Sequence, residues 1–188
     1  MEPVTDVSPS SFKLVNRVMV LCWRLGLGRL INCSPARLGR IMVLRVTGRK
    51  SGQPRLAPLN YAPGDGEVSC VAGYGEKSQW LRNLQANPEL EVWLPDGRWS
   101  GRAVLVEEPE ARLKALRRVL QNSGFAAKSL AGVDPFALSD EELEQKTAEY
   151  RVVRIVLLGP AVGPGGPGDL AWLLWLGLGL GLLVVSRW

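Results

Sequence analysis

The stretch LRVTGRKSGQPR, residues 44–55, decides the fold of this chain. It starts inside the β-branched run Ile41–Thr47, which predicts a strand. A turn containing glycine and proline interrupts this run, and Arg55–Ala62 predicts a second strand after the turn. The two strands are therefore expected to form an antiparallel hairpin with a basic tip.

Two further turn motifs predict hairpins downstream. The turn Pro63-Gly64-Asp65-Gly66 precedes a strand expected over Glu67–Gly73. The turn Pro95-Asp96-Gly97 separates strands expected over Leu90–Leu94 and Arg98–Val106. Consecutive hairpins with few helices favour an antiparallel barrel or sandwich of the α+β class over a doubly wound sheet.

The remaining elements of the core are helices and a closing strand. Amphipathic patterns predict helices over Gln79–Ala86 and Glu108–Leu120, and a capping box at Ser139–Glu142 opens another helix. Arg151–Leu158 predicts the last strand. The chain is thus divided into an N-terminal amphipathic segment, a barrel core, a Gly/Pro linker and a hydrophobic tail, over residues 1–40, 41–158, 159–168 and 169–188.

The N-terminal segment contains an amphipathic pattern over residues 11–32. Apolar side chains recur there at helical spacing, with bases on the flanks, which predicts one helix. Two interpretations stay open: the helix packs on the core, or it lies on a membrane surface.

The tail holds 16 residues, Leu170–Val185, without a charge or a hydroxyl group. A helix that spans a bilayer needs about 20 apolar residues, with a lower limit of about 17. The pattern therefore favours a C-terminal hydrophobic helix that acts as a tail anchor, and a buried core helix is the alternative. Arg151 and Arg154 on the N-terminal side of the tail favour a barrel that faces the cytoplasm.

The net charge of +5 is distributed unevenly over the 188 residues. Residues 1–60 hold ten Lys or Arg but only two acids, whereas the rest of the chain holds 13 bases and 16 acids. No acid occurs between Asp6 and Asp65. Such a basic front half favours an anionic ligand: cofactor phosphates, nucleic acid or lipid head groups.

Two features of the composition exclude classes of chemistry. The chain has no histidine, which excludes Ser-His-Asp and Cys-His catalysis and the usual zinc sites, so no metal is expected. The cysteines Cys22, Cys33 and Cys70 are odd in number and far apart. They form no disulfide framework and are interpreted as apolar packing residues.

Two clusters of residues could bind a ligand. In the first hairpin loop, glycines would let backbone N–H groups converge on an anion, and Arg49 and Lys50 add positive charge. In the predicted helix 79–86, Trp80 and Asn83 lie three residues apart and share a face. Taken separately, the loop is more typical of a solvated hairpin tip than of a binding site. The second cluster is more typical of a Trp80 that anchors the helix in the core, with Asn83 facing solvent.

Together, the two clusters resemble the deazaflavin-dependent nitroreductase and quinone reductase family. The resemblance rests on the quoted stretch 44–55, on Pro58-Leu59, and on Trp80, Asn83-Leu84 and Ala86-Asn87-Pro88, and covers about residues 41–106. It implies a split β-barrel similar to the FMN-binding split barrels, with flanking helices. It also implies a coenzyme of the F-420 type (8-hydroxy-5-deazaflavin), with FMN as the alternative cofactor.

The resemblance also implies which residues bind the coenzyme. Arg49, Lys50, Ser51 and Arg55 would hold its phosphate and acidic tail. The ring would lie against two strand segments and the first turns of the predicted helix, which comprise Leu56, Ala57, Pro58, Leu59, Asn60, Val71, Ala72, Gly73, Tyr74, Gln79, Trp80, Leu81, Arg82 and Asn83.

The implied activity is hydride transfer from the reduced coenzyme to a quinone, a nitro compound or a conjugated ketone. Relatives often carry a tyrosine at the position of Asn60, so Tyr74 is the candidate catalytic proton donor here. A non-catalytic protein that binds a cofactor or lipid is the alternative.

The expected partners are a hydrophobic electron acceptor, membrane lipid and a second copy of the chain in a homodimer. No nucleic acid is expected, since no recognition motif for it occurs.

Overall fold

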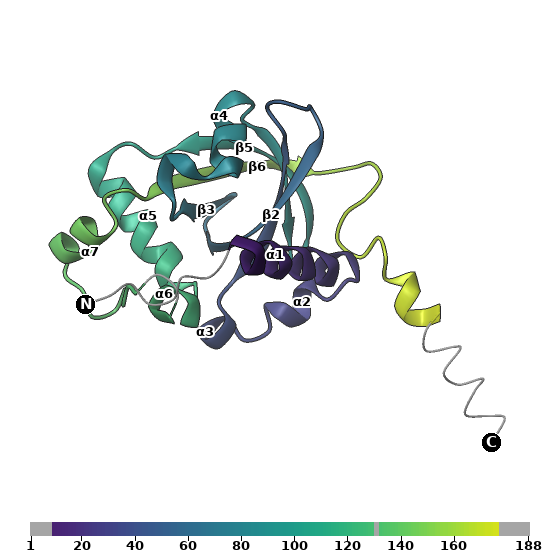
Figure 1. Cartoon of the computed structure of the whole chain (residues 1–188), viewed down its shortest axis with the longest axis horizontal. Coiled ribbons are helices and arrows are strands. Elements are labelled where there is room, and N and C mark those ends of the chain that lie inside the picture. The colour runs from purple at the N-terminus through teal and green to yellow at the C-terminus, as the bar shows by residue number, and fades with distance from the viewer. Residues whose placement is uncertain (1–8, 130–131, 177–188) are drawn as a thin grey trace, which may run out of the picture.

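A closed barrel of six antiparallel strands forms the centre of the computed structural model, which describes residues 9–129 and 132–176 (Figure 1). The barrel order is β1-β2-β3-β6-β5-β4, and β1 pairs with β4 to close it. The strands are β1 (Ile41–Thr47), β2 (Pro54–Pro63), β3 (Glu67–Ala72), β4 (Glu89–Leu94), β5 (Gly97–Leu105) and β6 (Arg151–Pro160).

The expectation of a mainly antiparallel α+β barrel with flanking helices is confirmed. The helices are α1 (Pro9–Arg24), α2 (Gly28–Ile31), α3 (Pro35–Leu38), η1 (Gly75–Lys77), α4 (Gln79–Ala86), α5 (Pro109–Gln121), α6 (Phe125–Ser129) and α7 (Asp140–Lys146). The capping box at Ser139 is present, and the Glu108 side chain caps α5 by accepting from the N–H groups of Glu110 and Ala111.

Alternation of side chains decides which strand face is buried. In β3, Val68, Cys70 and Ala72 point into the barrel core. Strand β1 is buried on both faces, since Leu44 fills the barrel and Val43 packs outward against α1. The outer surface of the barrel therefore has an apolar area against which α1 packs.

The N-terminal region differs from the single helix expected over residues 11–32. Helix α1 ends at Arg24 because Gly26 adopts a φ of +82°, and α2 follows as a separate short helix. Trp23, which is 1% exposed, packs beside Gly28, where a Cβ atom would lie 2.5 Å from the indole. The left-handed glycine therefore ends α1, and the packing of Trp23 beside Gly28 places α2.

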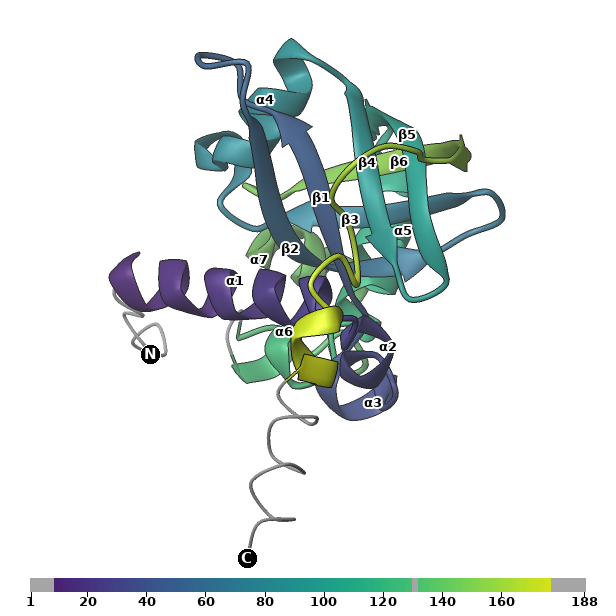
Figure 2. The same ribbon diagram turned by 90° about the vertical axis from the view of Figure 1, so that its right-hand side faces the viewer.

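Residues 161–170 were expected to belong mostly to an unpacked linker, but they lie against the barrel and α1. Figure 2 shows this segment running across the outside of β4 and β1 toward α1 and α2. A short helical turn follows, and most of the expected tail, residues 177–188, lies outside the described residues. In the part of the chain that the structure does describe, no helix combines the length and apolarity needed to cross a bilayer.

The cysteines have different environments. All three are free thiols. Cys70 is fully buried in the barrel, which raises the pKa of its thiol, as expected for a packing residue. Cys33 is exposed, so the packing interpretation is wrong for that position.

Candidate functional site

The β1–β2 loop is a tight turn that its glycines make possible. The N–H of Gly48 donates to the carbonyl of Gln53 at 2.9 Å, and the N–H of Gly52 donates to the carbonyl of Gly48 at 2.8 Å. A Cβ atom at residue 48 would lie 3.0 Å from the Gln53 oxygen and 3.1 Å from the Ser51 hydroxyl oxygen. A glycine there lets the turn close upon itself.

The closed turn changes how an anion could bind to this loop. The N–H groups of Gly48, Ser51 and Gly52 all donate within the turn, and that of Arg49 donates to Asn83. The expected nest of converging backbone donors is therefore not formed by these groups. Anion binding falls instead to the side chains of the loop.

Asn83 of α4 connects the helix to the loop. Its amide oxygen accepts from the backbone nitrogen of Arg49 at 3.2 Å and from the Arg49 guanidinium at 3.0 Å. The same guanidinium donates to the amide oxygen of Gln79 at 3.0 Å. Asn83 is only 6% exposed, so the interpretation that places it in solvent is wrong.

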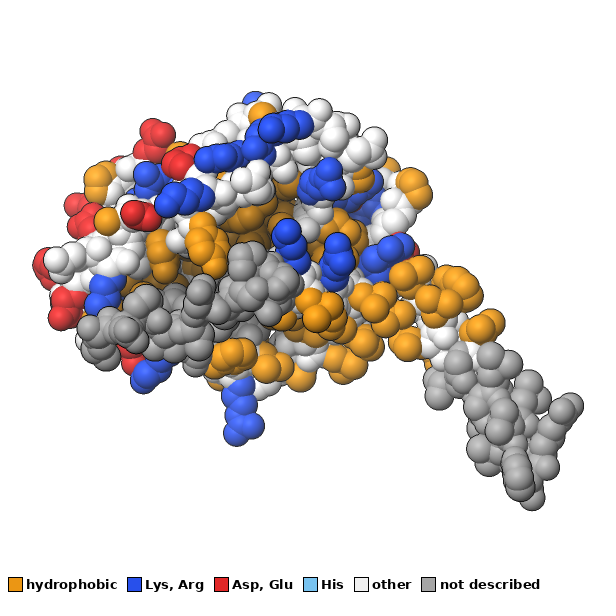
Figure 3. Space-filling view, in the orientation of Figure 1, with side chains coloured by type: hydrophobic (Ala, Val, Ile, Leu, Met, Phe, Trp, Pro, Cys, Tyr) orange, Lys and Arg blue, Asp and Glu red, His pale blue; other side chains and the backbone are white. Residues whose placement is uncertain are grey.

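The cations of this loop keep their charge free for a ligand. Arg49 is bonded to neutral amides, and within the described structure the Arg55 guanidinium has one side-chain hydrogen bond, to the Ser51 hydroxyl at 3.4 Å. None of the ion pairs among the described residues includes Arg49, Lys50 or Arg55. In Figure 3, Lys and Arg side chains gather over the upper part of the molecule and acidic side chains at its left end.

A cavity of about 460 Å³ lies between this loop and α4 and is called the loop–α4 cavity below. Its polar and cationic side chains come from the loop and α4, and its apolar part from the start of β2 and from Trp80, which also packs against the barrel core. The lining residues are Asn16, Gly48, Arg49, Lys50, Ser51, Arg55, Leu56, Ala57, Gln79, Trp80 and Asn83.

The cavity brings together nine of the residues singled out from the sequence and adds two others. Asn16 of α1 was missed, whereas Gly48 is predicted as a turn residue of the basic loop but not as a coenzyme contact. The signal for Asn16 was a polar residue on the same helical face as Trp23, seven positions away.

The other predicted site residues lie outside the cavity lining. Leu81 and Ala72 are buried in the barrel core, and Leu59 packs against it. Arg82 donates to the carbonyl of Glu76 at 2.6 Å, and the amide of Asn60 donates to the carbonyl of Arg40 at 3.2 Å.

The remaining predicted positions follow from the geometry of β2 and β3. Pro58 pairs with Val43 across β1 and β2, and Val71 packs against the second core cluster, under α5 and α7. Gly73 and Tyr74 follow β3, and Tyr74 is 67% exposed. Neither lines the cavity, so a role for Tyr74 as proton donor stays a prediction.

The residues of the cavity suit a ligand that is anionic at one end and planar and apolar at the other. Two guanidinium groups and one ammonium group match phosphate or carboxylate oxygens. Trp80, Leu56 and Ala57 provide surface for a ring system. The fold is a closed antiparallel barrel, and its cavity has the charge and the apolar surface that a phosphorylated or carboxylated ring compound would need.

Comparison with known proteins identifies the family. A model of the F420H(2)-dependent quinone reductase family matches residues 27–130, more than half of the chain. The chain therefore belongs to this family. A Mycobacterium tuberculosis protein, Rv3178, whose name describes an F420H(2)-dependent quinone reductase, is 38% identical over 76 residues. That match covers 38% of this chain and 64% of the relative, so the chain spans just under two thirds of the length of the curated relative.

Several solved structures are also similar. A conserved protein of unknown function from Mycobacterium tuberculosis, Rv2991, is 23% identical, with 88% of this chain and 96% of the other covered and a TM-score of 0.46. An F420-H2 dependent reductase is 25% identical, with 61% and 92% covered and a TM-score of 0.39. The family assignment rests on the sequence match and not on these structures.

Proposed function

We propose that this protein is a deazaflavin-dependent oxidoreductase that binds reduced coenzyme F420 in the loop–α4 cavity. The observation that carries the proposal is the gathering of Arg49, Lys50 and Arg55 at one cavity with no carboxylate partner in the described structure. Membership of the F420H(2)-dependent quinone reductase family supports the choice of coenzyme.

Each part of the cavity has a separate task in this proposal. Arg49, Lys50 and Arg55 would neutralise the phosphate and the acidic tail of the coenzyme, and Ser51 would donate its hydroxyl hydrogen to an oxygen of the same group. Trp80 and the start of β2 would orient the ring. When bound, the reduced coenzyme supplies a hydride, and the protein contributes position and electrostatics.

The electron acceptor would be a quinone, and a nitro compound or a conjugated ketone is the alternative. No Asp or Glu is among the residues that line the cavity in the described structure, so a proton for the reduced acceptor would come from a hydroxyl group or from water. Tyr74→Phe tests the proton-donor prediction directly. Since Tyr74 lies outside the lining, we expect turnover to stay within about twofold of wild type, and a loss of about tenfold or more would assign it the role.

We also propose that the protein works at a membrane with the barrel facing the cytoplasm. The uncharged stretch Leu170–Val185 supports this setting, as do the exposed indoles of Trp172 and Trp175 at its start. A bilayer setting would suit a hydrophobic acceptor dissolved in lipid.

Titration distinguishes the proposed cofactor from FMN. We expect the full-length protein in detergent to bind coenzyme F420 more tightly than FMN, and to oxidise the reduced coenzyme when a menaquinone-like acceptor is added. Equal affinity for both cofactors would reject the specificity for the deazaflavin. Binding without turnover on quinone, nitro or enone acceptors would favour the non-catalytic alternative.

A further inference from the structure

Helix α1 borders the loop–α4 cavity through one residue, Asn16. Asn16 lines the cavity, and Trp23 lies on the same side of the helix and packs against Val43 and Trp93 on the barrel. The indole nitrogen atoms of Trp23 and Trp93 are buried and find no partner among the described residues. Helix α1 thus packs on the barrel through apolar contacts, but two buried indole N–H groups there lack a hydrogen-bond partner in the described structure. Other contacts contribute to holding the helix in place.

The opposite side of α1 is an exposed apolar surface with a cationic border. Leu14, Val18 and Leu21 are 62%, 52% and 47% exposed. With about 100° per residue, these three lie together, about 180° from Asn16 and Trp23. Lys13, Arg17 and Arg24 follow one edge of this surface. Such a pattern is typical of a helix that lies in the interface of an anionic bilayer.

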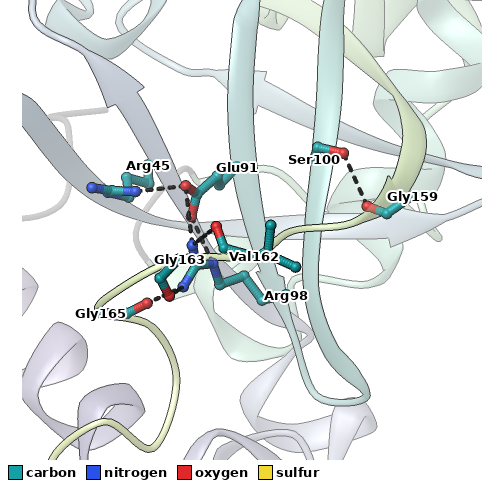
Figure 4. Close-up of polar contacts among 8 residues, drawn as sticks. All are labelled: Arg45, Glu91, Arg98, Ser100, Gly159, Val162, Gly163 and Gly165. Atoms are coloured by element: carbon teal, nitrogen blue, oxygen red, sulfur yellow. Dashed lines mark hydrogen bonds and ion pairs between the residues drawn. The ribbon is translucent and has the colours of Figure 1, made fainter.

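The segment after β6, residues 161–170, is fixed to the barrel by one arginine and is called the strap below. The Arg98 guanidinium donates to the carbonyls of Val162 and Gly163, both at 3.0 Å, and to that of Gly165 (Figure 4). Glu91 pairs with Arg98 at 2.8 Å and with Arg45 at 2.5 Å. The backbone of the strap therefore replaces the side chains that a Gly/Pro segment lacks.

The far end of the strap binds the C-terminus of α1. The N–H groups of Gly168 and Leu170 donate to the carbonyls of Trp23 and Arg24 at 2.9 and 2.8 Å, so they satisfy groups that a helix end leaves unpaired. The Asp169 carboxylate accepts from the Arg24 guanidinium at 2.8 to 3.1 Å. This pair is called the clasp below.

The tail begins directly after the clasp. The side chains of residues 172–176, including two tryptophans, are 40% to 74% exposed, and the sequence continues without a charge as far as Val185. Figure 2 shows that α1, α2 and the start of the tail lie at the same end of the molecule. The start of the tail thus lies beside the C-terminal end of α1, to which Gly168 and Leu170 are bonded.

We propose that the strap and the clasp hold α1 so that its inner side completes the coenzyme cavity while its outer side, together with the exposed side chains of residues 172–176, forms a surface for an anionic bilayer. The inference rests on the proposed function for the coenzyme part only. An anionic bilayer fits the surface better than a protein partner, because tryptophan and a border of cations beside exposed aliphatic side chains suit a lipid interface.

The test uses the full-length protein, phosphatidylcholine vesicles with or without about a third phosphatidylglycerol, and coenzyme F420. Val18→Glu/Leu21→Glu should weaken binding to the anionic vesicles at least about tenfold, since two apolar side chains that would insert into the bilayer become charged. Arg17→Gln should weaken it about fivefold. Val104→Glu, at a 42% exposed position on β5, is the matched control and should bind like wild type.

The clasp is tested by charge reversal. Arg24→Glu and Asp169→Arg should each weaken coenzyme binding by up to about threefold and vesicle binding by up to about fivefold. The double exchange Arg24→Glu/Asp169→Arg should restore coenzyme binding. The proposal is overturned if the wild-type protein binds the coenzyme and the clasp variants bind both the coenzyme and the vesicles as tightly as wild type. So would normal vesicle binding by Val18→Glu/Leu21→Glu. Wild-type protein that binds vesicles but no coenzyme would instead reject the proposed function.

Discussion

Asn83 and Arg49 are joined twice, because one amide oxygen accepts from both the backbone nitrogen and the guanidinium of the arginine. This contact fixes the basic loop to α4 with a neutral acceptor. A carboxylate at the same place would hold the loop equally well but would cancel its charge. Arg49 is thus held in place at the loop–α4 cavity, and no carboxylate in the described structure neutralises its charge.

Asn83→Asp tests this arrangement. The variant should fold as stably as wild type, because the acceptor is kept and an ion pair replaces a neutral hydrogen bond. Coenzyme affinity should fall about tenfold, the loss expected when a charge-assisted hydrogen bond of about 1.5 kcal/mol is removed. Isothermal titration measures the affinity, and thermal denaturation measures the stability.

Asn87→Asp is the matched control for Asn83→Asp. Asn87 ends the same helix, where its side chain accepts from the N–H of Glu89, and it does not line the cavity. It should therefore leave coenzyme affinity nearly unchanged. Equal losses in both variants would show that long-range charge, and not the contact with Arg49, determines affinity.

The bases near the cavity are expected to differ in their effect on binding. Lys50→Ala and Arg55→Ala should each weaken coenzyme binding about tenfold or more, and the difference from wild type should shrink at high salt. Arg82→Ala is the comparison, because that guanidinium donates to the carbonyl of Glu76 and does not line the cavity. A titration at two ionic strengths checks the prediction. It is wrong if Arg82→Ala costs as much as Lys50→Ala.

The sequence predicts elements whose pattern is local. The hairpins follow from alternation and turn residues near one another in the chain, and the capping box at Ser139 needs only four residues. The single helix over residues 11–32 fails because Gly26 adopts a φ of +82° and Trp23 packs beside Gly28 in the folded chain. The position of Trp23 depends on the apolar outer surface of β1 and β4, which no local pattern in the sequence reveals.

The sequence predicts the part of the site that comes from the basic loop and α4, but it does not predict the contribution of α1. The resemblance connects the basic loop with Trp80 and Asn83, and the cavity contains all of these. Asn16 lies more than 30 residues before the loop, and its position depends on the docking of α1. The strap is missed because backbone carbonyls, which every sequence has, make its contacts with Arg98.

The clasp gives a dependence on acidity. Hydrogen bonds from Arg24 lower the pKa of Asp169 below its ordinary value, and the same contact raises the pKa of Arg24, which stays charged. Since the pKa of this carboxyl is lower in the folded protein, the clasp is fully formed above the ordinary aspartate pKa of about 3.9 and is lost as the pH falls through the lowered value.

Hydrogen exchange of the last turn of α1, corrected for the intrinsic rate, should therefore accelerate below about pH 4. Asp169→Asn should show faster exchange at neutral pH and no additional acceleration in acid. The clasp does not hold the helix if exchange in this turn is the same in both proteins at neutral pH.

The place where the chain is shortened should decide what is lost. If residues 160–188 were only a linker and a tail anchor, as the sequence predicts, their removal would release the protein from membranes and leave coenzyme affinity little changed. The strap alters this expectation, because residues 161–170 bind both Arg98 and the end of α1.

A chain that ends at residue 170 should leave the membrane fraction and keep the affinity of the full-length protein. A chain that ends at residue 160 should bind coenzyme F420 about threefold more weakly, on the scale of a few lost hydrogen bonds, because α1 no longer holds Asn16 at the cavity. Titration of both shortened proteins in the same buffer separates the two effects, and equal affinities would mean that α1 stays docked without the strap.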